Sequence, residues 1–387
     1  MTVIWKPELD PAATQWQALA DQLGRDRFGP LAEELDREQR YPWESIEALV
    51  ANNFTGLFLP REFGGQGESL VTTVAAVETL GTHCASTAAI MCAYQLGAFP
   101  ILLAGTDQQK DFYLREMTQG RATSFALSER IAGSDAAAIE ATATREGDGW
   151  RLRGEKYWIG NGGASRYYVV FAKTDPAAGG RGISAFMVDK EQPGAVIDEL
   201  SDKMGIRGTQ TSNLKVDLVV PDSARIGELN RALRLAMQTL NVGRIMVASQ
   251  SLGLALAAYR EASRYAVSRK TFGQPLIDNQ GIGFKLADMA TEISAARMML
   301  YEAARTYDKG GNVSELGAMA KLFCSEVAHR AADAAVQIWG GLGYCKPTVA
   351  ERLYRDQRIL EIYEGSSEIQ RLVLARSVRK EVEEQAG

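Results

Sequence analysis

The spacing of hydrophobic residues changes twice along the chain, and this change limits the possible folds more than any other feature of the sequence. Up to about residue 122 the apolar residues recur at helical intervals. They then fall into short runs rich in β-branched and aromatic residues, at 150–159, 167–174 and 183–188, which glycine-containing turns separate. After Pro221 the helical spacing returns. The pattern predicts an α+β protein with an N-terminal helical domain at 1–122, a compact β domain at 123–225 and a helical domain at 226–387.

The C-terminal part of the chain contains three long apolar stripes. Each stripe repeats every three or four residues, as the buried face of a long helix does. The stripes are formed by Leu252, Leu256, Tyr259, Ala262 and Ala266; by Leu286, Met289, Ile293, Ala296 and Leu300; and by Leu316, Ala320, Phe323, Val327 and Ile338. Together with a shorter helix at the C-terminus, they predict a four-helix bundle.

Composition and charge exclude several classes of protein. The 387 residues are 46% hydrophobic and 24% charged, which is ordinary for a globular protein, and the net charge of −5 is spread without a basic block, so nucleic acid is not an expected partner. Residues 79–106 are almost uncharged, but polar residues and Pro100 interrupt them, which favours two buried helices over a membrane span. No secretory signal precedes the first domain, so a cytoplasmic location is expected. Two histidines and four scattered cysteines give no metal-site spacing, and no bound metal is expected.

Familiar nucleotide-binding and hydrolase motifs are absent, and the chemistry has to be sought in the loops. The segment 361–371, EIYEGSSEIQR, places Glu364 between an aromatic residue and a glycine. Ser367 and Gln370 have the spacing of a capping box, which predicts that a helix begins directly after Glu364. A carboxylate there suits a general base, since burial raises its pKa and the helix dipole lowers it. The alternative is a solvated capping residue.

A second set of loop residues suits a planar aromatic ligand. The segments 124–135, SFALSERIAGSD, and 157–162, YWIGNG, combine aromatic side chains, hydroxyls and glycines near the ends of predicted strands. Exposed backbone amides and aromatic rings at such positions bind heteroaromatic groups. The alternative is that Phe125 and Trp158 are core residues and that the glycines only form turns.

These segments occur in an order that resembles the acyl-CoA dehydrogenase family. The resemblance rests on FALSERIAGSD, GEKYWIGNGG, SRKTFGQPLIDNQ, AVQIWGGLGY and IYEGSSEIQR, and it covers residues 10–380. It implies a barrel-like central β domain and bound FAD between this domain and the helical bundle. The residues that match the family's FAD contacts are Phe125, Leu127, Ser128, Ser134, Trp158, Ile159, Gly160, Arg269, Phe272, Gln280, Gln337, Gly340, Gly341, Ser366 and Glu368.

The resemblance also implies a reaction. Glu364 matches the catalytic base that takes a proton from an acyl thioester while a hydride passes to the flavin, which gives an enoyl thioester. Ser134, Asn241, Arg244 and Gly365 match residues that contact the substrate. Because Arg269 and residues 337–341 would reach the FAD of a neighbouring subunit, a homo-oligomer, expected to be a tetramer, is implied. An electron-transfer flavoprotein is the implied electron acceptor.

The chain departs from the family pattern at four positions. Arg130 and Ile131 stand where the family has Pro-Gly, Gly160 where it has a hydroxyl residue, and Asn241 where it has Asp. An acyl-CoA oxidase or a flavin monooxygenase on the same fold therefore remains an alternative, as does a non-catalytic scaffold. The acyl chain, the position of the new double bond, the carrier, which is coenzyme A or acyl carrier protein, and the natural electron acceptor stay open.

Overall fold

The computed structural model describes residues 3–386, and its N-terminal part is helical. The helices are α1 (Pro11–Leu23), α2 (Gly29–Glu38), α3 (Trp43–Ala51), α4 (Leu70–Gly81), α5 (Ala85–Ala104) and α6 (Asp107–Thr118). Ser69 caps α4, and Thr106 and Gln109 form a reciprocal capping box at the start of α6. The prediction that residues 79–106 are buried helix is confirmed, but the stretch holds one complete helix, α5, and only the end of a second, α4, which begins nine residues earlier at Leu70.

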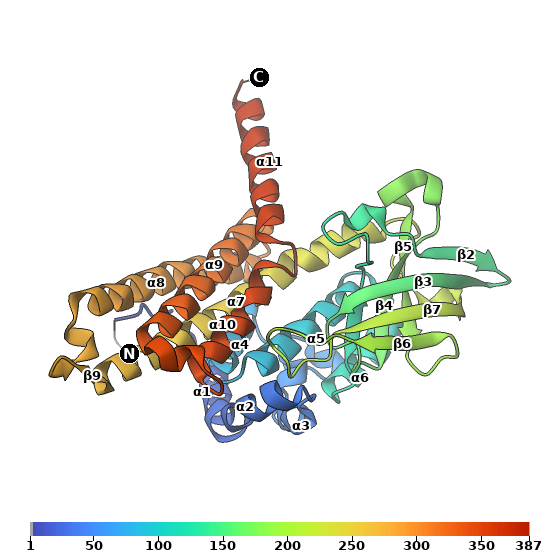
Figure 1. The fold of residues 1–387 in the computed structure, drawn as a ribbon. Coiled ribbons are helices and arrows are strands. Elements are labelled where there is room, and N and C mark those ends of the chain that lie inside the picture. Colours follow the sequence, from blue (N-terminus) through green and yellow to red (C-terminus); the bar gives the residue numbers. More distant parts are fainter. Residues whose placement is uncertain (1–2, 387) are drawn as a thin grey trace.

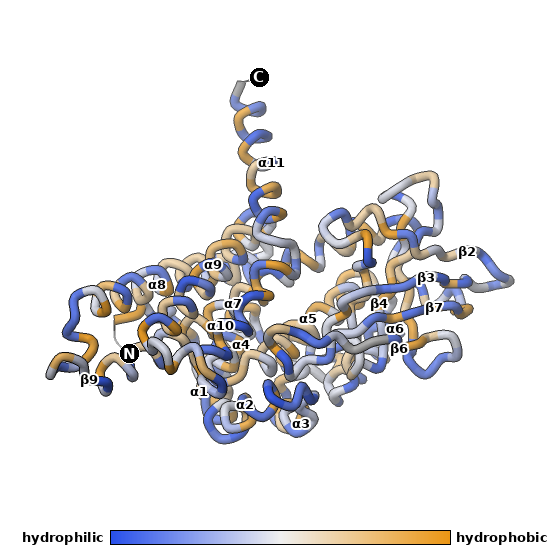
Figure 2. Tube along the Cα trace, viewed as in Figure 1, coloured by the Kyte–Doolittle hydropathy of each residue, from blue (hydrophilic) through white to orange (hydrophobic). Residues whose placement is uncertain are grey.

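Two described helices, α5 and α7 (Ala232–Ser268), are long and apolar enough to cross a membrane by length and composition. The protein itself buries 72% of the relevant window of α5 and 94% of that of α7. Figure 2 shows hydrophobic residues along both helices where they lie inside the molecule. Both are central core helices of this fold.

The middle of the chain is an eight-stranded sheet. Its strands are β1 (Thr123–Ala126), β2 (Thr142–Glu146), β3 (Gly149–Ile159), β4 (Tyr167–Lys173), β5 (Ile183–Asp189), β6 (Ala195–Leu200), β7 (Ser212–Pro221) and β8 (Arg225–Ile226). The order is β6-β7-β3-β2-β4-β5-β8, and β1 pairs in parallel with β4. The strands at the two ends of this order, β6 and β8, each pair with only one described neighbour, so the curved sheet is not fully closed.

The position of strand β4 between two cores explains why its sequence is apolar throughout and does not alternate with polar residues. Tyr168 and Val170 point into a core enclosed by the sheet. Val169 and Phe171 belong instead to the large core that the sheet shares with the helices. A strand buried on both faces needs a continuous apolar run. The sheet is thereby fixed against the helices that carry the site.

The C-terminal part consists of α7, α8 (Gln280–Asp308), α9 (Ser314–Trp339), α10 (Val349–Gln357) and α11 (Ser367–Ala386), with a small hairpin of β9 (Lys270–Thr271) and β10 (Gln274–Pro275) after α7. Helices α7, α8 and α9 lie side by side, α10 packs against α7 and α9, and α11 projects away from the body (Figure 1). The predicted order of helical, β and helical parts is confirmed.

Candidate active site

Glu364 lies in the turn before α11, and its side chain reaches the contact between α5 and α7. A Cβ atom on Gly243 of α7 would lie 2.5 Å from Oε2 of Glu364 and 3.1 Å from Cδ1 of Leu96 on α5. Glu364 and Gly365 both have left-handed backbones, with φ of 56° and 89°. Only a small residue at 243 leaves room for this carboxylate, so the glycine at that position shapes the site.

The surroundings of Glu364 bring its protonation close to neutral pH. Burial raises the pKa of Glu364 to about 7, and the positive charges of Lys321 and Arg244 act against this rise. Its Oε2 atom is buried and has no hydrogen-bond partner among the described residues. An unpartnered buried carboxylate with such a pKa can take up a proton from a bound molecule.

The capping box predicted at Ser367 and Gln370 is wrong, because the capping side chain is that of Ser366, one residue earlier. Helix α11 begins at Ser367, and the Oγ of Ser366 accepts the N–H of Ile369 at 3.5 Å. Gln370 does not bond back to the cap, because its Nε2 donates to the carbonyls of Gly365 at 2.7 Å and Glu364 at 3.2 Å. These carbonyls lie in the tight turn around the carboxylate and take the amide that the capping box would have used.

Of the four predicted substrate residues, Asn241, Arg244 and Gly365 lie beside Glu364. Ser134 lies apart from them. Arg244 is 5% exposed, its Nη1 donates to Oδ1 of Asn241 at 3.1 Å, and burial lowers its pKa while the charge of Glu364 raises it. Its Nε has no partner among the described residues. Gly365 follows the carboxylate directly. Ser134 lies on an exposed loop of the β domain and makes no hydrogen bond to the other three in the described part of the chain.

Hydrogen bonds join the two segments predicted to bind a flat aromatic group. The N–H of Tyr157 donates to the carbonyl of Ser128 at 2.9 Å. The hydroxyl of Ser124 donates to the carbonyl of Gly160 at 2.7 Å. A Cβ on Gly160 would lie 3.7 Å from Cβ of Ala93, so this end of the sheet touches α5. Leu96 of the same helix and the carboxylate of Glu364 both lie next to Gly243 of α7.

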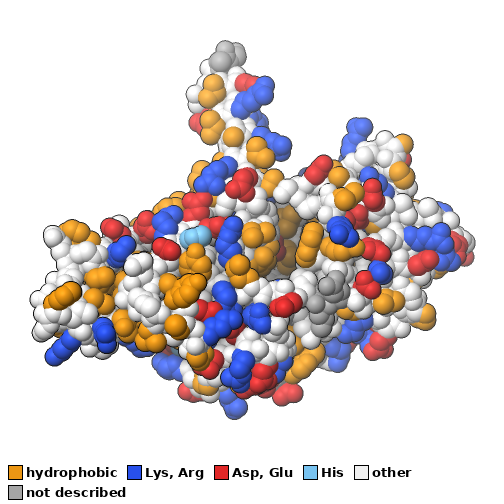
Figure 3. Space-filling model, viewed as in Figure 1, with side chains coloured by type: hydrophobic (Ala, Val, Ile, Leu, Met, Phe, Trp, Pro, Cys, Tyr) orange, Lys and Arg blue, Asp and Glu red, His pale blue; other side chains and the backbone are white. Residues whose placement is uncertain are grey.

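The side chains at this end of the sheet divide into two groups. Trp158 is 56% exposed and has φ of 56°, whereas Leu127 and Ile159 are buried and can offer a ligand only their backbone. Phe125 is half-buried against Phe171, with ring centroids 4.8 Å apart. Figure 3 shows that the surface is hollowed where the helical bundle meets the β domain.

A buried ion pair beneath these segments was not predicted from the sequence. Nζ of Lys156 lies 2.7 Å from Oε1 of Glu129 and 3.1 Å from the carbonyl of Leu127. The Glu129 carboxylate also accepts the backbone N–H groups of Glu140 and Ala141. Its signal in the sequence was that Lys156 alternates in step with the apolar Trp150 and Leu152, which places it on the inward face of the strand.

Six of the predicted cofactor residues lie at the far end of the bundle. Arg269 and Phe272 belong to the hairpin after α7, and Phe272 is 99% exposed. Tyr265 stacks on Trp339 with ring centroids 4.7 Å apart, which places the end of α9 beside this hairpin. The other exposed residues here are Gln280, Gln337, Gly340 and Gly341. Since Arg244 and Arg269 are separated by most of α7, about 37 Å at 1.5 Å per residue, one chain does not bring these groups to Glu364.

The residues present fit a dinucleotide cofactor such as FAD. Nothing lies within 4 Å of a Cβ built on Gly340 or Gly341, so a diphosphate can approach their backbone. Arg269 is exposed and has no ion-pair partner in the described part of the chain. Its planar guanidinium can bind two phosphate oxygens at once.

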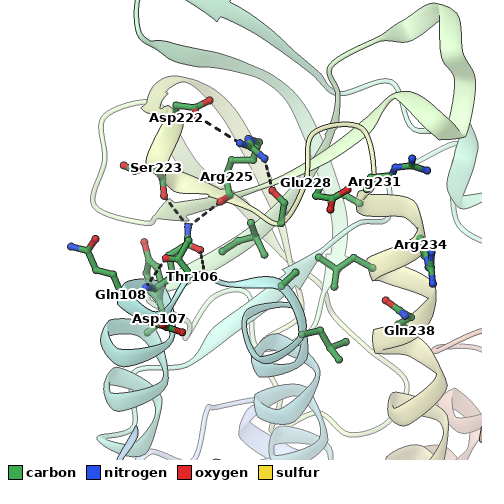
Figure 4. Close-up of a pocket in the computed structure, with 18 of the residues that line it drawn as sticks. Thr106, Asp107, Gln108, Asp222, Ser223, Arg225, Glu228, Arg231, Arg234 and Gln238 are labelled. Atoms are coloured by element: carbon green, nitrogen blue, oxygen red, sulfur yellow. Dashed lines mark hydrogen bonds and ion pairs between the residues drawn. The ribbon is translucent and has the colours of Figure 1, made fainter.

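A cavity of about 1320 Å³ lies elsewhere, between the α5–α6 turn, β8 and the first turns of α7. Figure 4 shows Arg231 and Arg234 on the α7 side of this cavity and Thr106 at the start of α6 on the other side. None of the predicted site residues lines it. The cavity is therefore separate from the carboxylate of Glu364.

Nearly all of the chain matches one family. Residues 10–121, 124–219 and 230–379 match the N-terminal, middle and C-terminal domains of acyl-CoA dehydrogenases. The protein belongs to the acyl-CoA dehydrogenase family and is an oxidoreductase of the type that acts on CH–CH groups, as the resemblance implied.

Individual relatives match over nearly their full length. The chain is 41% identical over 375 residues to a 3-(aryl)acrylate reductase of Clostridium sporogenes, covering 95% of this chain and 99% of that protein. It is 43% identical over 377 residues to the mitochondrial short-chain specific acyl-CoA dehydrogenase of Mus musculus, covering 97% and 92%. Among solved structures, butyryl-CoA dehydrogenase from Megasphaera elsdenii has a TM-score of 0.94 and 37% identity, covering 97% and 100%. The prolyl acyl carrier protein oxidase AnaB has a TM-score of 0.93 and 28% identity, covering 96% and 100%.

Proposed function

We propose that the protein removes hydrogen from the Cα–Cβ bond of a short acyl thioester and releases an enoyl thioester, with Glu364 as the base. Bound FAD supplies the hydride acceptor. The observation that carries the proposal is the carboxylate of Glu364. It is buried, has an unpartnered oxygen and a pKa of about 7, and lies next to two cations. A base of this kind removes a weakly acidic proton near neutral pH.

Groups around the carboxylate suit the thioester part of the substrate. In the described part of the chain, the amide N–H of Glu364 donates to no protein acceptor. Such a donor can stabilise the negative charge that develops on the thioester oxygen when the α-proton leaves. Asn241 and Arg244 lie beside it on α7 and offer further polar contacts.

The interior beyond the carboxylate supports a short acyl chain. Gln250 on α7 is fully buried, and its Oε1 accepts a hydrogen bond from the hydroxyl of Tyr363. Cys92 on α5 is also buried and donates to the carbonyl of Met246 at 3.4 Å. These side chains fill the space between α5 and α7, so a long chain would need to displace them. The names of the mouse and Megasphaera relatives agree with this inference.

The cofactor and its partners are part of the same proposal. The β-domain residues bind the flavin ring, and the exposed group around Arg269 binds the diphosphate part of FAD in a neighbouring subunit. Ser366 and Glu368, at the start of α11, lie next to the base and complete the set. Coenzyme A is the proposed carrier, an electron-transfer flavoprotein the acceptor, and the cytoplasm the location.

The proposal is tested with purified protein by flavin absorbance and by dye-coupled turnover of acyl-CoA substrates from four to sixteen carbons. We expect the highest kcat/KM with the shortest chains. Glu364→Gln should keep FAD and substrate binding and lose about 100-fold to 10,000-fold in turnover, the usual effect of removing a general base. Glu302→Gln, at an exposed glutamate of α8 away from this turn, is the control. Rapid flavin bleaching by substrate in Glu364→Gln would contradict the assignment.

The oxidase alternative is tested in the same assay. AnaB, which shares the fold, is an oxidase of an acyl carrier protein substrate. For a dehydrogenase, we expect turnover with a dye under anaerobic conditions and little hydrogen peroxide in air. Peroxide formation at the rate of dye reduction would favour the oxidase.

A further inference from the structure

Lys321 is a fully buried lysine in the middle of α9. Gly317 and Cys324, one helical turn away on the same face, and Ala328, two turns away, are buried as well. Lysine is almost never fully buried unless it has a partner, because removing an ammonium group from water is costly. A fully buried lysine on an apolar face therefore needs an explanation.

The partner of Lys321 is a backbone carbonyl and not a carboxylate. Its Nζ donates to the carbonyl oxygen of Gly365 at 2.8 Å. Within residues 3–386 no carboxylate lies within ion-pair distance of this ammonium. Its charge interacts favourably with Glu364, Glu361 and Glu368 and unfavourably with Arg244. The ammonium is thus held next to the Glu364 turn without neutralising any one acid directly.

The carbonyl that Lys321 holds belongs to a strained turn. Glu364 and Gly365 are consecutive left-handed residues, and a left-handed conformation is unfavourable for a non-glycine residue. Such a conformation persists only where the surroundings fix it. Lys321 and Gln370 both donate to Gly365, and Gln370 donates to Glu364 as well. These two buried side chains fix the turn from α9 and from α11.

We propose that Lys321 is a positioning residue for Glu364: by holding the carbonyl of Gly365 it sets the direction of the Glu364 carboxylate, and its charge favours the ionised carboxylate. This inference rests on the proposed function of Glu364 as the base. It assigns two effects to one side chain, a geometric one shared with Gln370 and an electrostatic one that Gln370 does not have.

The charged and titratable groups around Glu364 predict the pH dependence. Lys321 faces it from α9, Arg244 from α7 and Cys92 from α5, with Tyr363 in the same turn. Burial raises the pKa of Cys92 and Tyr363, so both stay neutral. Burial lowers the pKa of Lys321 to about 8. Activity should therefore rise with pH through about 7, as Glu364 loses its proton, and fall above about 8, as Lys321 does.

Three variants of the holoenzyme separate the two effects. Lys321→Met removes donor and charge, Gln370→Met removes the other donor and no charge, and Lys321→Arg keeps both features. We expect Lys321→Met to lower kcat about 10-fold to 100-fold, as a misplaced catalytic group does, with a smaller change in KM. The rise of activity on the acid side of its pH profile, the acid limb, should occur about one pH unit higher than in the wild type. The fall of activity above about pH 8 should disappear.

The other variants give the contrasting results. Gln370→Met should lower kcat without moving the acid limb, and Lys321→Arg should keep the acid limb of the wild type. Lys285→Met, at an exposed lysine on α8, is the control for loss of a lysine and should match the wild type. An unchanged pH profile in Lys321→Met overturns the proposal, and so does a fall in kcat with no shift of the acid limb.

A second measurement covers the case in which Lys321→Met does not fold. The proposal then stands only if the wild type loses activity above pH 8 and Lys321→Arg moves this loss to higher pH. A wild type active at a constant level to pH 10 overturns it. Failure of the proposed function is distinguishable, because the wild type would then turn over no acyl thioester at any pH.

Discussion

At the scale of single residues, Gly243 decides whether the Glu364 carboxylate can occupy its place. The nearest atom to a Cβ on Gly243 would be Oε2 of Glu364, at 2.5 Å. Gly243→Ala should therefore displace the carboxylate, and a catalytic group misplaced by about 1 Å costs about 100-fold in rate. The helix itself gains a residue with better helix propensity. We expect a loss of kcat/KM with FAD content and Tm close to the wild type.

Steady-state kinetics, flavin absorbance and thermal unfolding of Gly243→Ala test this expectation. Gly281→Ala on α8 is the control, since nothing lies within 4 Å of its Cβ. A Gly243→Ala enzyme with full activity would show that the carboxylate does not depend on this space. A loss of activity that parallels a loss of Tm would assign the effect to stability.

Sequence reasoning found Glu364 because its neighbours form a recognisable segment in a fixed order. It missed Lys321 because a lysine on a helix is ordinarily read as solvent-exposed, and the carbonyl that binds it lies 44 residues further along the chain. Gln370 was noticed, but its predicted partner was wrong. A buried polar side chain is predicted well when its partner is close in sequence and poorly when the fold brings the partner from another element.

At the scale of elements, the Glu129–Lys156 pair joins the loop after β1 to strand β3. Lys156 is fully buried and Glu129 is 5% exposed. Removing one partner of a buried pair leaves an uncompensated charge and costs about 3–5 kcal/mol. Lys156→Met should therefore destabilise the protein by roughly that amount, and Glu129→Gln combined with Lys156→Met should recover part of the loss.

Urea unfolding of the two single variants and the double variant measures the coupling between Glu129 and Lys156. Because the pair lies beneath Leu127 and Ser128, we also expect Lys156→Met to lose FAD on gel filtration more readily than the wild type. An unfolding midpoint of Lys156→Met equal to that of the wild type would show that the pair is not needed. Arg153→Met, an exposed cation on the same strand, is the control.

Helix α10 is joined to the β domain by a buried acid. Oδ1 of Asp356 accepts the N–H of Ile206 at 2.6 Å, and burial raises the pKa of Asp356 to about 6. The folded protein holds this proton to a higher pH than the unfolded chain does. The resulting stabilisation is full below about pH 4 and is lost as the pH rises through about 6. Asp356→Asn keeps an acceptor for Ile206 and has no charge to bury.

We therefore expect the Tm of Asp356→Asn, relative to that of the wild type, to increase between pH 5 and pH 8. The pKa rise of about two units corresponds to at most about 3 kcal/mol at pH 8. Asp36→Asn is the contrasting variant, since it breaks the ion pair with Arg355, whose Nη2 lies 2.6 Å from Oδ2 of Asp36. Thermal unfolding at the two pH values decides. A Tm difference for Asp356→Asn that falls from pH 5 to pH 8 would refute the expectation.

The elements themselves were largely predictable from the sequence, and their contacts were not. The three stripes became α7, α8 and α9, because long amphipathic helices need little context to be recognised. The departure of α11 from the bundle was not visible, since its sequence fits a packed helix as well as an exposed one. Figure 2 shows hydrophobic and hydrophilic residues alternating along this exposed helix. The position of such a helix is determined by the surface that it packs against and not by its own sequence.

At the scale of the whole molecule, the predicted cofactor residues lie in two places that α7 keeps apart. The hairpin with Phe272 and the projecting helix α11 expose apolar side chains that the chain itself does not cover. Phe272 is 99% exposed, and Leu372, Val378 and Val382 of α11 are 50–59% exposed. Burial of one such side chain is worth about 1.5–3 kcal/mol, which favours assembly. A second copy of this chain, bringing its hairpin to the β-domain residues of the first, would unite the two halves of the site.

Assembly and FAD binding are therefore expected to depend on each other. A ligand that binds only the assembled form stabilises it by mass action. Arg269→Ala should lower FAD content and shift the protein from tetramer, or at least dimer, toward monomer, and added FAD should reverse part of that shift. Phe272→Asp should weaken assembly first and lose FAD as a consequence. Arg25→Ala, at an exposed arginine just after α1, should do neither. Light scattering with simultaneous flavin absorbance measures both quantities, and a monomeric wild type with a full complement of FAD would contradict the shared site.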